Sequence, residues 1–282
     1  MLWDYLQNGL VNGSTITIMA LGFALVYNTF RVFHIAYAGL FTLAAYTFLF
    51  LTANFHLSVA VAMILSIIPV ALLSWLIDFV VYNPVSRKGN DPNLLMIASV
   101  GVFIVITNLL GLVFGNQPRI IPESLRTSWM DIRLMIFFIQ TLLIIVFAIF
   151  LKSTVTGLML RAVRDEPRLS MNLGIPAARM RSLVFILSGT LVAVAGSLQC
   201  LDVGVNPYSG LPLFISAFIA MVIGGVGRYE GAVLGGFLLG LIQSFTEYFT
   251  GSQWVVVITF VVLLVFLFIR PEGIIPEKQR GV

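Results

Sequence analysis

The chain has 282 residues, of which 59% are hydrophobic and only 10% are charged, and its mean hydropathy is +1.03. A soluble domain carries about 25% charged residues, so this composition excludes a water-soluble domain. The formal net charge of +4 does not indicate nucleic-acid binding, because the basic residues lie between apolar runs and form no continuous stripe. The composition predicts an all-α polytopic membrane protein embedded in a lipid bilayer.

Nine apolar segments have about the length that a membrane crossing needs, which is about 20 mainly apolar residues. We therefore expect about nine spans, within a range of eight to ten. The seventh segment is short enough to be a broken or re-entrant helix. The segments are Gly9–Phe30, Val32–Ala53, Leu57–Tyr82, Leu94–Phe114, Leu134–Leu151, Leu183–Val203, Leu211–Val226, Ala232–Thr250 and Trp254–Ile269. Turn-rich or polar loops are expected at Asn83–Asn93 and Gly115–Arg133.

The N-terminus and the few cysteines and histidines exclude several kinds of chemistry. The first ten residues carry Asp4 and no basic residue, so a cleavable signal peptide is not expected and the first span should remain in the protein. Cys200 is the only cysteine, which excludes an internal disulfide and a cysteine metal site. His34 and His56 are too few for a histidine-rich metal site, so no metal is expected.

One long polar interruption, Lys152–Ser182, predicts the orientation of the chain. It contains six of the sixteen basic residues, namely Lys152, Arg161, Arg164, Arg168, Arg179 and Arg181. Basic residues in short loops are retained on the cytoplasmic side of a membrane. With this loop inside and nine alternating spans, thirteen basic residues fall inside and three outside. The N-terminus is therefore predicted to lie outside and the C-terminus in the cytoplasm.

The same loop has internal helix signals. Pro167 can begin a helix, and the run Gly174-Ile175-Pro176 is typical of one helix ending before another begins. Asp165 and Glu166 are expected at the start of the short helix, where the helix dipole favours negative charge. The loop is either an ordinary positive-inside connector or a docking element, and its length of roughly 30 residues exceeds what a simple connection needs.

Small and polar residues are concentrated at the start of the chain. Asn12, Ser14 and Thr15 begin the first apolar segment, and Asn28, Tyr37 and Gly39 follow at its end and in the next segment. Such residues let helices approach closely in a membrane. Alternatively, their polar groups line a translocation path, and no single residue decides between the two interpretations.

A second concentration of small residues is the glycine-rich stretch Met221–Gly240. Two GxxxG pairs, Gly231/Gly235 and Gly236/Gly240, favour close helix packing. Gly224, Gly225 and Gly227 are denser than packing requires. They either break a helix at membrane depth, where exposed backbone must face protein or a water-filled cavity, or form a tight turn between two helices.

Ionisable residues within the spans are few. Asp78 and Glu247 are the acids furthest inside, and a local ion pair or an interfacial position explains each better than a functional role. None of the three lysines has the glycine spacing of a Walker A motif. If ATP drives this protein, the ATPase is another chain, and this chain has no cofactor and no catalytic residue of its own.

Several stretches of the chain resemble the permease subunits of branched-chain amino-acid type ABC importers, and they occur in the same order as in that family. They are Gly9–Gly39, Val81–Lys88, Gly157–Leu198, Val222–Gln243 and the RPEGII sequence at Arg270–Ile275. The resemblance implies one transmembrane permease domain over residues 1–282 in the inner or plasma membrane. It also implies a second homologous or identical permease chain, two cytoplasmic ATPases and an extracytoplasmic solute-binding protein.

The resemblance further assigns roles to residues of this chain. Residues 152–182 become the coupling loop on an ATPase, with contacts expected at Arg161, Asp165, Glu166, Leu169, Leu173, Gly174, Ile175 and Arg179. The translocation path is expected to include Asn12, Ser14, Thr15, Asn28, Tyr37, Gly39, Gly224, Gly225 and Gly227.

The chain departs from the family in a motif similar to NFAHGE after the first span. The matching residues His34–Leu40 lack the acid and carry Tyr37 in place of the histidine. The solute is therefore expected to be a small amphipathic or zwitterionic compound, such as an amino acid or a related carboxylate or amide. The alternative function is an ion-coupled secondary transporter, for which Asp78 and Glu247 are weak material, or a channel.

Overall fold

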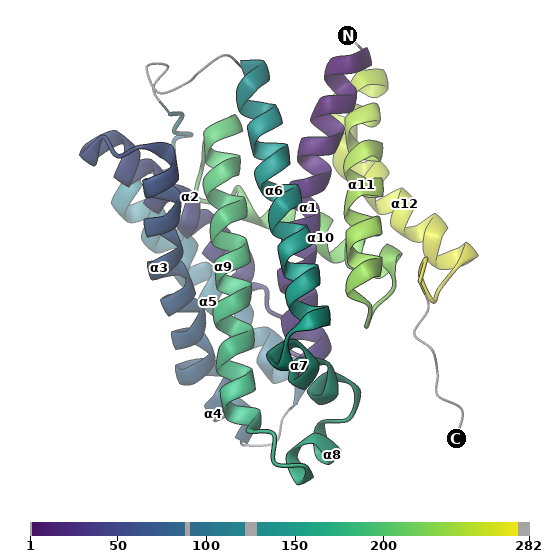
Figure 1. The fold of residues 1–282 in the computed structure, drawn as a ribbon. Helices are drawn as coiled ribbons and strands as arrows, with labels where there is room; N and C mark the ends of the chain where they lie inside the picture. The colour runs from purple at the N-terminus through teal and green to yellow at the C-terminus, as the bar shows by residue number, and fades with distance from the viewer. Residues whose placement is uncertain (1, 88–90, 122–128, 276–282) are drawn as a thin grey trace. The chain divides into compact units, whose positions relative to one another are not determined.

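A computed structural model describes residues 2–87, 91–121 and 129–275 of the chain. The described residues form helices joined by short connections (Figure 1). In chain order these are α1 (Leu2–Phe30), α2 (Ala36–Phe55), α3 (Val59–Ile77), the π-helical turn η1 (Asp78–Tyr82), α4 (Asn83–Arg87), α5 (Pro92–Phe114), α6 (Trp129–Ser153), α7 (Val155–Asp165), α8 (Pro167–Asn172), α9 (Ala177–Val203), α10 (Gly210–Gly224), α11 (Tyr229–Thr250), the 3-10 turn η3 (Ser252–Trp254) and α12 (Val255–Ile269).

The predicted all-α membrane fold is confirmed. Among the described residues, eight helical stretches are long and apolar enough to cross a membrane, and α10 is a shorter apolar helix of 15 residues. Each of the nine predicted apolar segments coincides with one of these helices. The seventh segment was expected to be short, and it is the one that falls below the length of a full span.

Several boundaries differ from those predicted. Helix α2 begins at Ala36, which leaves His34 in the linker after α1. Helix α6 begins at Trp129, so the end of the predicted loop Gly115–Arg133 is helical, while its residues 122–128 lie outside the described part. Helix α9 begins at Ala177, so Arg179 and Arg181 are helical residues and not loop residues. Apolar length alone underestimates α6 and α9 because their first residues include polar ones, and it places the start of α2 too early.

Two predictions about local structure were wrong. The predicted loop Asn83–Asn93 begins as helix, since η1 and α4 continue the direction of α3 as far as Arg87. Asp165 was expected to start the short helix at Pro167, but it is the last residue of α7, a helix that was not predicted. Thr154 begins α7 by accepting a hydrogen bond from the Gly157 amide at 3.0 Å, which satisfies one free donor of the first turn.

The chain divides into two compact units, which we describe separately. The first comprises residues 1–24, 127–141 and 212–282, that is, most of α1 and α10, the start of α6, and α11 and α12. In it, Phe23 packs edge-on against Phe214 and Phe218, with ring centroids 5.1 and 6.2 Å apart. Helix α12 is almost entirely exposed within this unit, so its apolar surface is available to lipid or to a partner chain.

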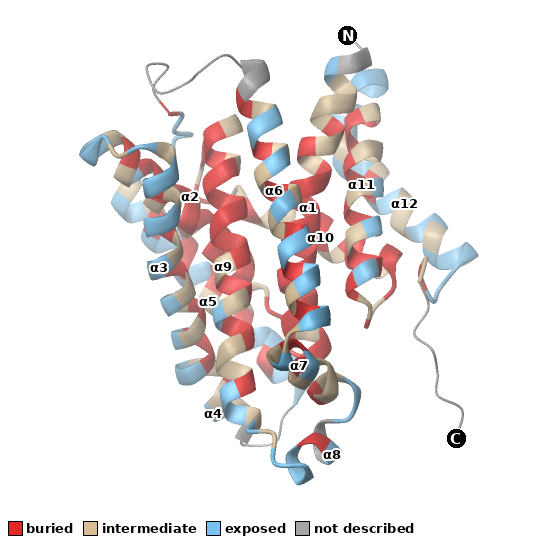
Figure 2. Ribbon diagram, in the orientation of Figure 1, coloured by how far each residue is buried: buried red, intermediate tan, exposed pale blue. Residues whose placement is uncertain are grey.

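The second unit comprises residues 25–126 and 142–211 and is organised around α9. Small residues let α9 approach its neighbours closely: Gly189 lies against Ala71 and Ser74 of α3, and Gly196 lies against Phe41 of α2. The Ser66 and Ser197 hydroxyls are 2.8 Å apart and add a hydrogen bond between α3 and α9. Figure 2 shows the resulting buried stretch along α9.

Candidate functional site

The segment α7–α8 carries the predicted contacts to a cytoplasmic partner. Arg161 does not extend into solvent; it folds back and donates to the Lys152 carbonyl at 3.2 Å and to the Gly157 carbonyl at 3.4 Å. Arg164 and Asp165 form an ion pair of 2.8 Å at the end of α7. These bonds stabilise α7, so the side chains of Arg161 and Asp165 are engaged in contacts within the segment.

Helix α8 presents an apolar surface to solvent. The side chains of Leu169, Met171 and Leu173 are 56%, 52% and 74% exposed, and we call these three residues the docking surface. The Ser170 hydroxyl donates to the Glu166 carbonyl at 2.8 Å and tightens the first turn of the helix. Two large apolar side chains exposed on a short helix and a third on the residue that caps its C-terminal end are typical of an interaction site.

The turn after α8 matches its predicted role as a helix stop. Gly174 has φ of +84°, a conformation that favours glycine, and its amide donates to the Met171 carbonyl at 3.0 Å. Ile175 is half-buried beside this turn, and Arg179 is exposed two residues after α9 begins. The eight predicted coupling residues therefore lie on one continuous segment from α7 to the first turn of α9.

The predicted path residues of the first unit are engaged by two glutamines that the sequence reading missed. Gln140 of α6 donates to the Thr15 hydroxyl at 2.9 Å and accepts from the Ser14 hydroxyl. Gln243 of α11 accepts from the Asn12 amide at 3.0 Å. A lone glutamine within an apolar span is the signal that could have identified both residues.

Gln243 also joins two further helices. Its amide nitrogen donates to Ser216 of α10 and to Thr259 of α12, both at 3.0 Å. Such bonds hold helices together where no water is available to satisfy polar groups. The arrangement gives Asn12, Ser14 and Thr15 a packing role, and their part in a translocation path remains a prediction.

The predicted path residues of the second unit lie near the linker between α1 and α2. Tyr37 is fully buried, with its ring centroid 5.8 Å from that of His34. Asn28 is buried near the end of α1. Gly39 packs against Ile106 of α5. A Cβ atom added to Gly39 would lie 3.2 Å from the Ile106 side chain. Gly39 therefore serves a close helix contact, and the part of these residues in a translocation path stays a prediction.

The glycine run at the end of α10 forms a tight turn. Gly225 and Gly227 have φ of +110° and +97°, and α11 begins two residues after Gly227. A tight turn between two helices is observed, and the depth of this turn in the membrane stays a prediction. Gly224 lies so close to Gly231 that a Cβ on Gly224 would be 1.9 Å from the Gly231 carbonyl oxygen.

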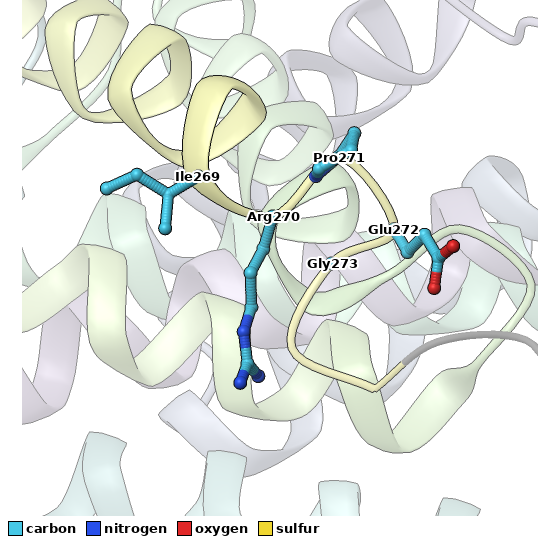
Figure 3. Close-up of a pocket in the computed structure, with 5 residues that line it drawn as sticks. All are labelled: Ile269, Arg270, Pro271, Glu272 and Gly273. Atoms are coloured by element: carbon cyan, nitrogen blue, oxygen red, sulfur yellow. The ribbon is translucent and has the colours of Figure 1, made fainter.

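The C-terminal segment Arg270–Ile275 lies against this turn. The Ile274 and Ile275 amides donate to the carbonyls of Ile223 and Gly224 at 2.9 and 3.0 Å. These bonds satisfy carbonyl groups that the last turn of α10 leaves without helical partners. Figure 3 shows the start of the segment, where Ile269–Gly273 line an open pocket of about 390 Å³ and the side chains of Arg270 and Glu272 extend in different directions.

The two GxxxG pairs of α11 pack against different helices of the first unit, which confirms the prediction of close packing. Gly231 and Gly235 face α10, and Gly235 lies against Ala220. Gly236 and Gly240 face α1, and Gly236 lies against Thr17. Helix α1 supplies its own pair, Gly9 and Gly13, at this contact.

The acids within the spans are placed as the sequence indicated. Asp78 forms an ion pair with Arg181 at 2.6 Å, and Glu247 is exposed near the end of α11. Within the described residues, no three histidine, cysteine or acidic side chains gather into a possible metal site. The candidate functional residues are therefore of two kinds: small and polar residues that make helix contacts, and exposed apolar residues at α8.

Together the apolar helices indicate a multi-pass membrane protein, and the short helix α8 carries exposed apolar residues. Residues 5–267 match the family described as "Branched-chain amino acid transport system / permease component". The chain belongs to this family and is a permease subunit of an ABC importer, resident in the membrane. Partnership with ATPase and binding-protein components follows from the family at that general level.

Individual relatives cover almost the whole chain. The high-affinity branched-chain amino acid transport system permease protein LivH of Salmonella typhimurium is 27% identical, over 97% of this chain and 96% of its own. The corresponding protein BraD of Pseudomonas aeruginosa is 28% identical over 99% of both chains. A solved structure, PsaBC from Streptococcus pneumoniae in complex with Fab, shares the fold with a TM-score of 0.55 at 16% identity, covering 95% of this chain and 92% of that one.

Proposed function

We propose that this permease moves an amino acid or a related small amphipathic solute by alternating access. It works with a second homologous or identical permease chain, two cytoplasmic ATPases and an extracytoplasmic solute-binding protein. The relatives named for branched-chain amino acid transport support this solute class. ATP is bound and hydrolysed by the partner chains, so this chain has no cofactor and no catalytic role.

The observation that carries the proposal is the docking surface on α8. Three exposed apolar side chains on a helix between two spanning helices provide anchors, and Glu166 and Arg179 provide charge near them. A helix seated in a groove uses apolar anchors for affinity and a charged rim for orientation. We assign this surface to an ATPase, with Arg161, Asp165, Gly174 and Ile175 holding its shape.

The proposed orientation places α7 and α8 in the cytoplasm and the N-terminus outside. It rests on the bias of basic residues, thirteen inside against three outside. Labelling of single cysteines in a Cys200→Ala background tests the orientation. Arg126 lies in the predicted outside loop, but it is outside the described residues. Exposed Asn116 and Ser153 serve instead: impermeant maleimide added outside should label N116C and spare S153C, and the reverse pattern would contradict the orientation.

The solute and the coupling are tested together in vesicles. The permease is reconstituted with its ATPases, second permease chain and binding protein, and the binding protein is first screened against amino acids, amides and carboxylates. We expect uptake of the bound solute to require both ATP and the binding protein. Uptake that follows an ion gradient without ATP would favour a secondary transporter, for which paired Asp78 and exposed Glu247 offer little support.

A further inference from the structure

One arginine in the second unit contacts several elements at once. The Arg181 Nε donates to Asp78 Oδ1 at 2.6 Å, and its Nη1 donates to the Ser86 hydroxyl of α4 at 3.3 Å. The guanidinium carbon lies 5.4 Å from the centroid of the Phe30 ring at the end of α1. The side chains of Arg181 and Asp78 are only 14% and 4% exposed. Arg181 therefore joins α9 to η1, α4 and α1 within a largely dehydrated contact.

Helix stability alone does not account for such a pair. Removing two charges from water costs free energy that their attraction often fails to return, and apolar residues of similar volume frequently serve as well. Helices α3 and α9 already have apolar contacts and the hydrogen bond between Ser66 and Ser197. Helices α3 and α9 are thus packed without the charged pair. The pair instead fixes the position of η1 relative to α9.

The element that Asp78 begins is a π-helical turn, which ends at Tyr82. The Tyr82 hydroxyl lies 2.7 Å from His34 Nδ1 and donates to the Ser99 hydroxyl at 2.9 Å. The Ser99 oxygen also accepts from the Ala36 amide at 2.9 Å, at the start of α2. One π-turn therefore holds α9 at its first residue and the linker between α1 and α2 at its last. Single π-helical turns within α-helices are frequent at functional sites.

Arg181 follows the docking surface closely along the chain. Arg181 is in the first turns of α9, and only the short turn after Asn172 separates α9 from α8 (Figure 1). Arg181 lies in the second turn of α9, so a displacement of α8 that the turn at residues 173–176 passes to the start of α9 reaches the Arg181 side chain. A continuous series of contacts then leads from Arg181 through Asp78 and Tyr82 to His34, beside Tyr37.

We propose that Arg181 and Asp78 are positioning residues for coupling, which transmit a displacement of α8 to η1 and so reposition Tyr82 against His34 beside the predicted path residue Tyr37. This inference rests on the proposed function, in which the ATPase acts on α8. Loss of the pair leaves the ATPase docked and hydrolysing but disconnects hydrolysis from solute movement. The quantity that changes is therefore solute transported per ATP hydrolysed.

The test replaces both charges by apolar side chains in D78L/R181M, because such a replacement preserves packing and avoids an unpaired buried charge. The complete complex is reconstituted in vesicles, and solute uptake and ATP hydrolysis are measured in the same sample. We expect the complex to assemble and hydrolyse ATP, with at least a tenfold fall in solute transported per ATP. A ratio within twofold of the unaltered complex would overturn the inference. Failure of the variant complex to assemble would assign the pair to folding and overturn it as well.

Rescue separates the ion pair from the individual residues. The exchanged variant D78R/R181D should restore solute transported per ATP above the level of D78N and of R181Q, and no restoration would count against the pair. E247Q is the matched control, since Glu247 is an acid in another spanning helix but is exposed; it should leave the ratio unchanged. If the unaltered complex shows no solute-dependent ATP hydrolysis, the proposed function fails. If the D78L/R181M complex transports as much solute per ATP as the unaltered complex, only this inference is overturned.

Discussion

Gly240 of α11 lies directly on Gly13 of α1, so that a Cβ atom on Gly240 would be 2.2 Å from the Gly13 Cα. Without water between helices, close backbone contact supplies much of the attraction that holds membrane helices together. This contact is therefore the point of the first unit that is most sensitive to an added side chain.

We expect Gly240→Val to separate α1 from α11 and to lower the free energy of unfolding by about 3 kcal/mol or more, since overpacking of a tight contact forces backbone shifts. The measurement is thermal unfolding of the purified chain in detergent. Gly101→Val is the control, because no atom lies within 4 Å of a Cβ at Gly101 of α5. Equal losses in the two variants would show that helix propensity, and not the contact, sets the cost.

The hydroxyl of Thr15 should contribute to helix association and not only to its own helix. Thr15→Val removes the acceptor for Gln140, and we expect a loss of about 1 kcal/mol in thermal unfolding. Thr190→Val is the matched control, since the Thr190 hydroxyl donates within α9 to the Ile186 carbonyl at 2.9 Å. A Thr190 variant as unstable as the Thr15 variant would contradict a special role for the bond to Gln140.

The docking surface predicts a loss of ATPase binding when one of its anchors is made polar. Leu173→Asp should weaken co-purification of the ATPase and abolish solute-stimulated hydrolysis, because one buried anchor contributes about 2 kcal/mol in a small interface. Asn172→Asp adds the same charge next to it without removing an anchor, and it should retain most of the binding. If both variants bind and hydrolyse normally, the segment is only a positive-inside connector.

Gly225 should not tolerate a side chain, for two separable reasons. Its φ of +110° disfavours other residues, and a Cβ would lie 2.4 Å from the Ile275 carbonyl oxygen. Gly225→Leu should therefore displace the C-terminal segment and lower transport at least tenfold, while the chain still inserts. Gly251→Leu shares the positive φ, with nothing closer than 3.9 Å, and isolates the backbone cost. Unchanged proteolysis of the C-terminus and unchanged transport in Gly225→Leu would refute the assignment.

The sequence was sufficient for the helices but not for their partners. Apolar length located the eight described helices that are long enough to cross a membrane and the shorter α10, because apolar character is a property of each segment by itself. The η1 turn and α7 were missed, since Asp78 meets a residue 103 positions away and Arg161 of α7 is held by the Lys152 carbonyl at the end of α6. Glycine spacing predicted close packing of α11, yet assigning one pair to α10 and the other to α1 required coordinates.

The candidate site was predictable to the same degree. The short helix after Pro167 follows from local signals, and its leucines are exposed, while their contact with an ATPase stays a prediction. The translocation residues were chosen for polarity alone, which does not reveal that Ser14 and Thr15 already have Gln140 as a partner. Polarity within a span identifies residues that need a partner, and only the fold shows whether that partner is another helix.

The brevity of α10 has a consequence for the surrounding lipid. Its 15 residues extend about 22 Å at 1.5 Å per residue, against a hydrocarbon core of about 30 Å. A short span usually forces the bilayer to thin around it. Here the ends are closed by protein: the Gly210 amide donates to the Thr42 hydroxyl at 3.2 Å, and the last carbonyls accept from Ile274 and Ile275. Helix α10 can thus end within the hydrophobic layer without drawing water or headgroups inward.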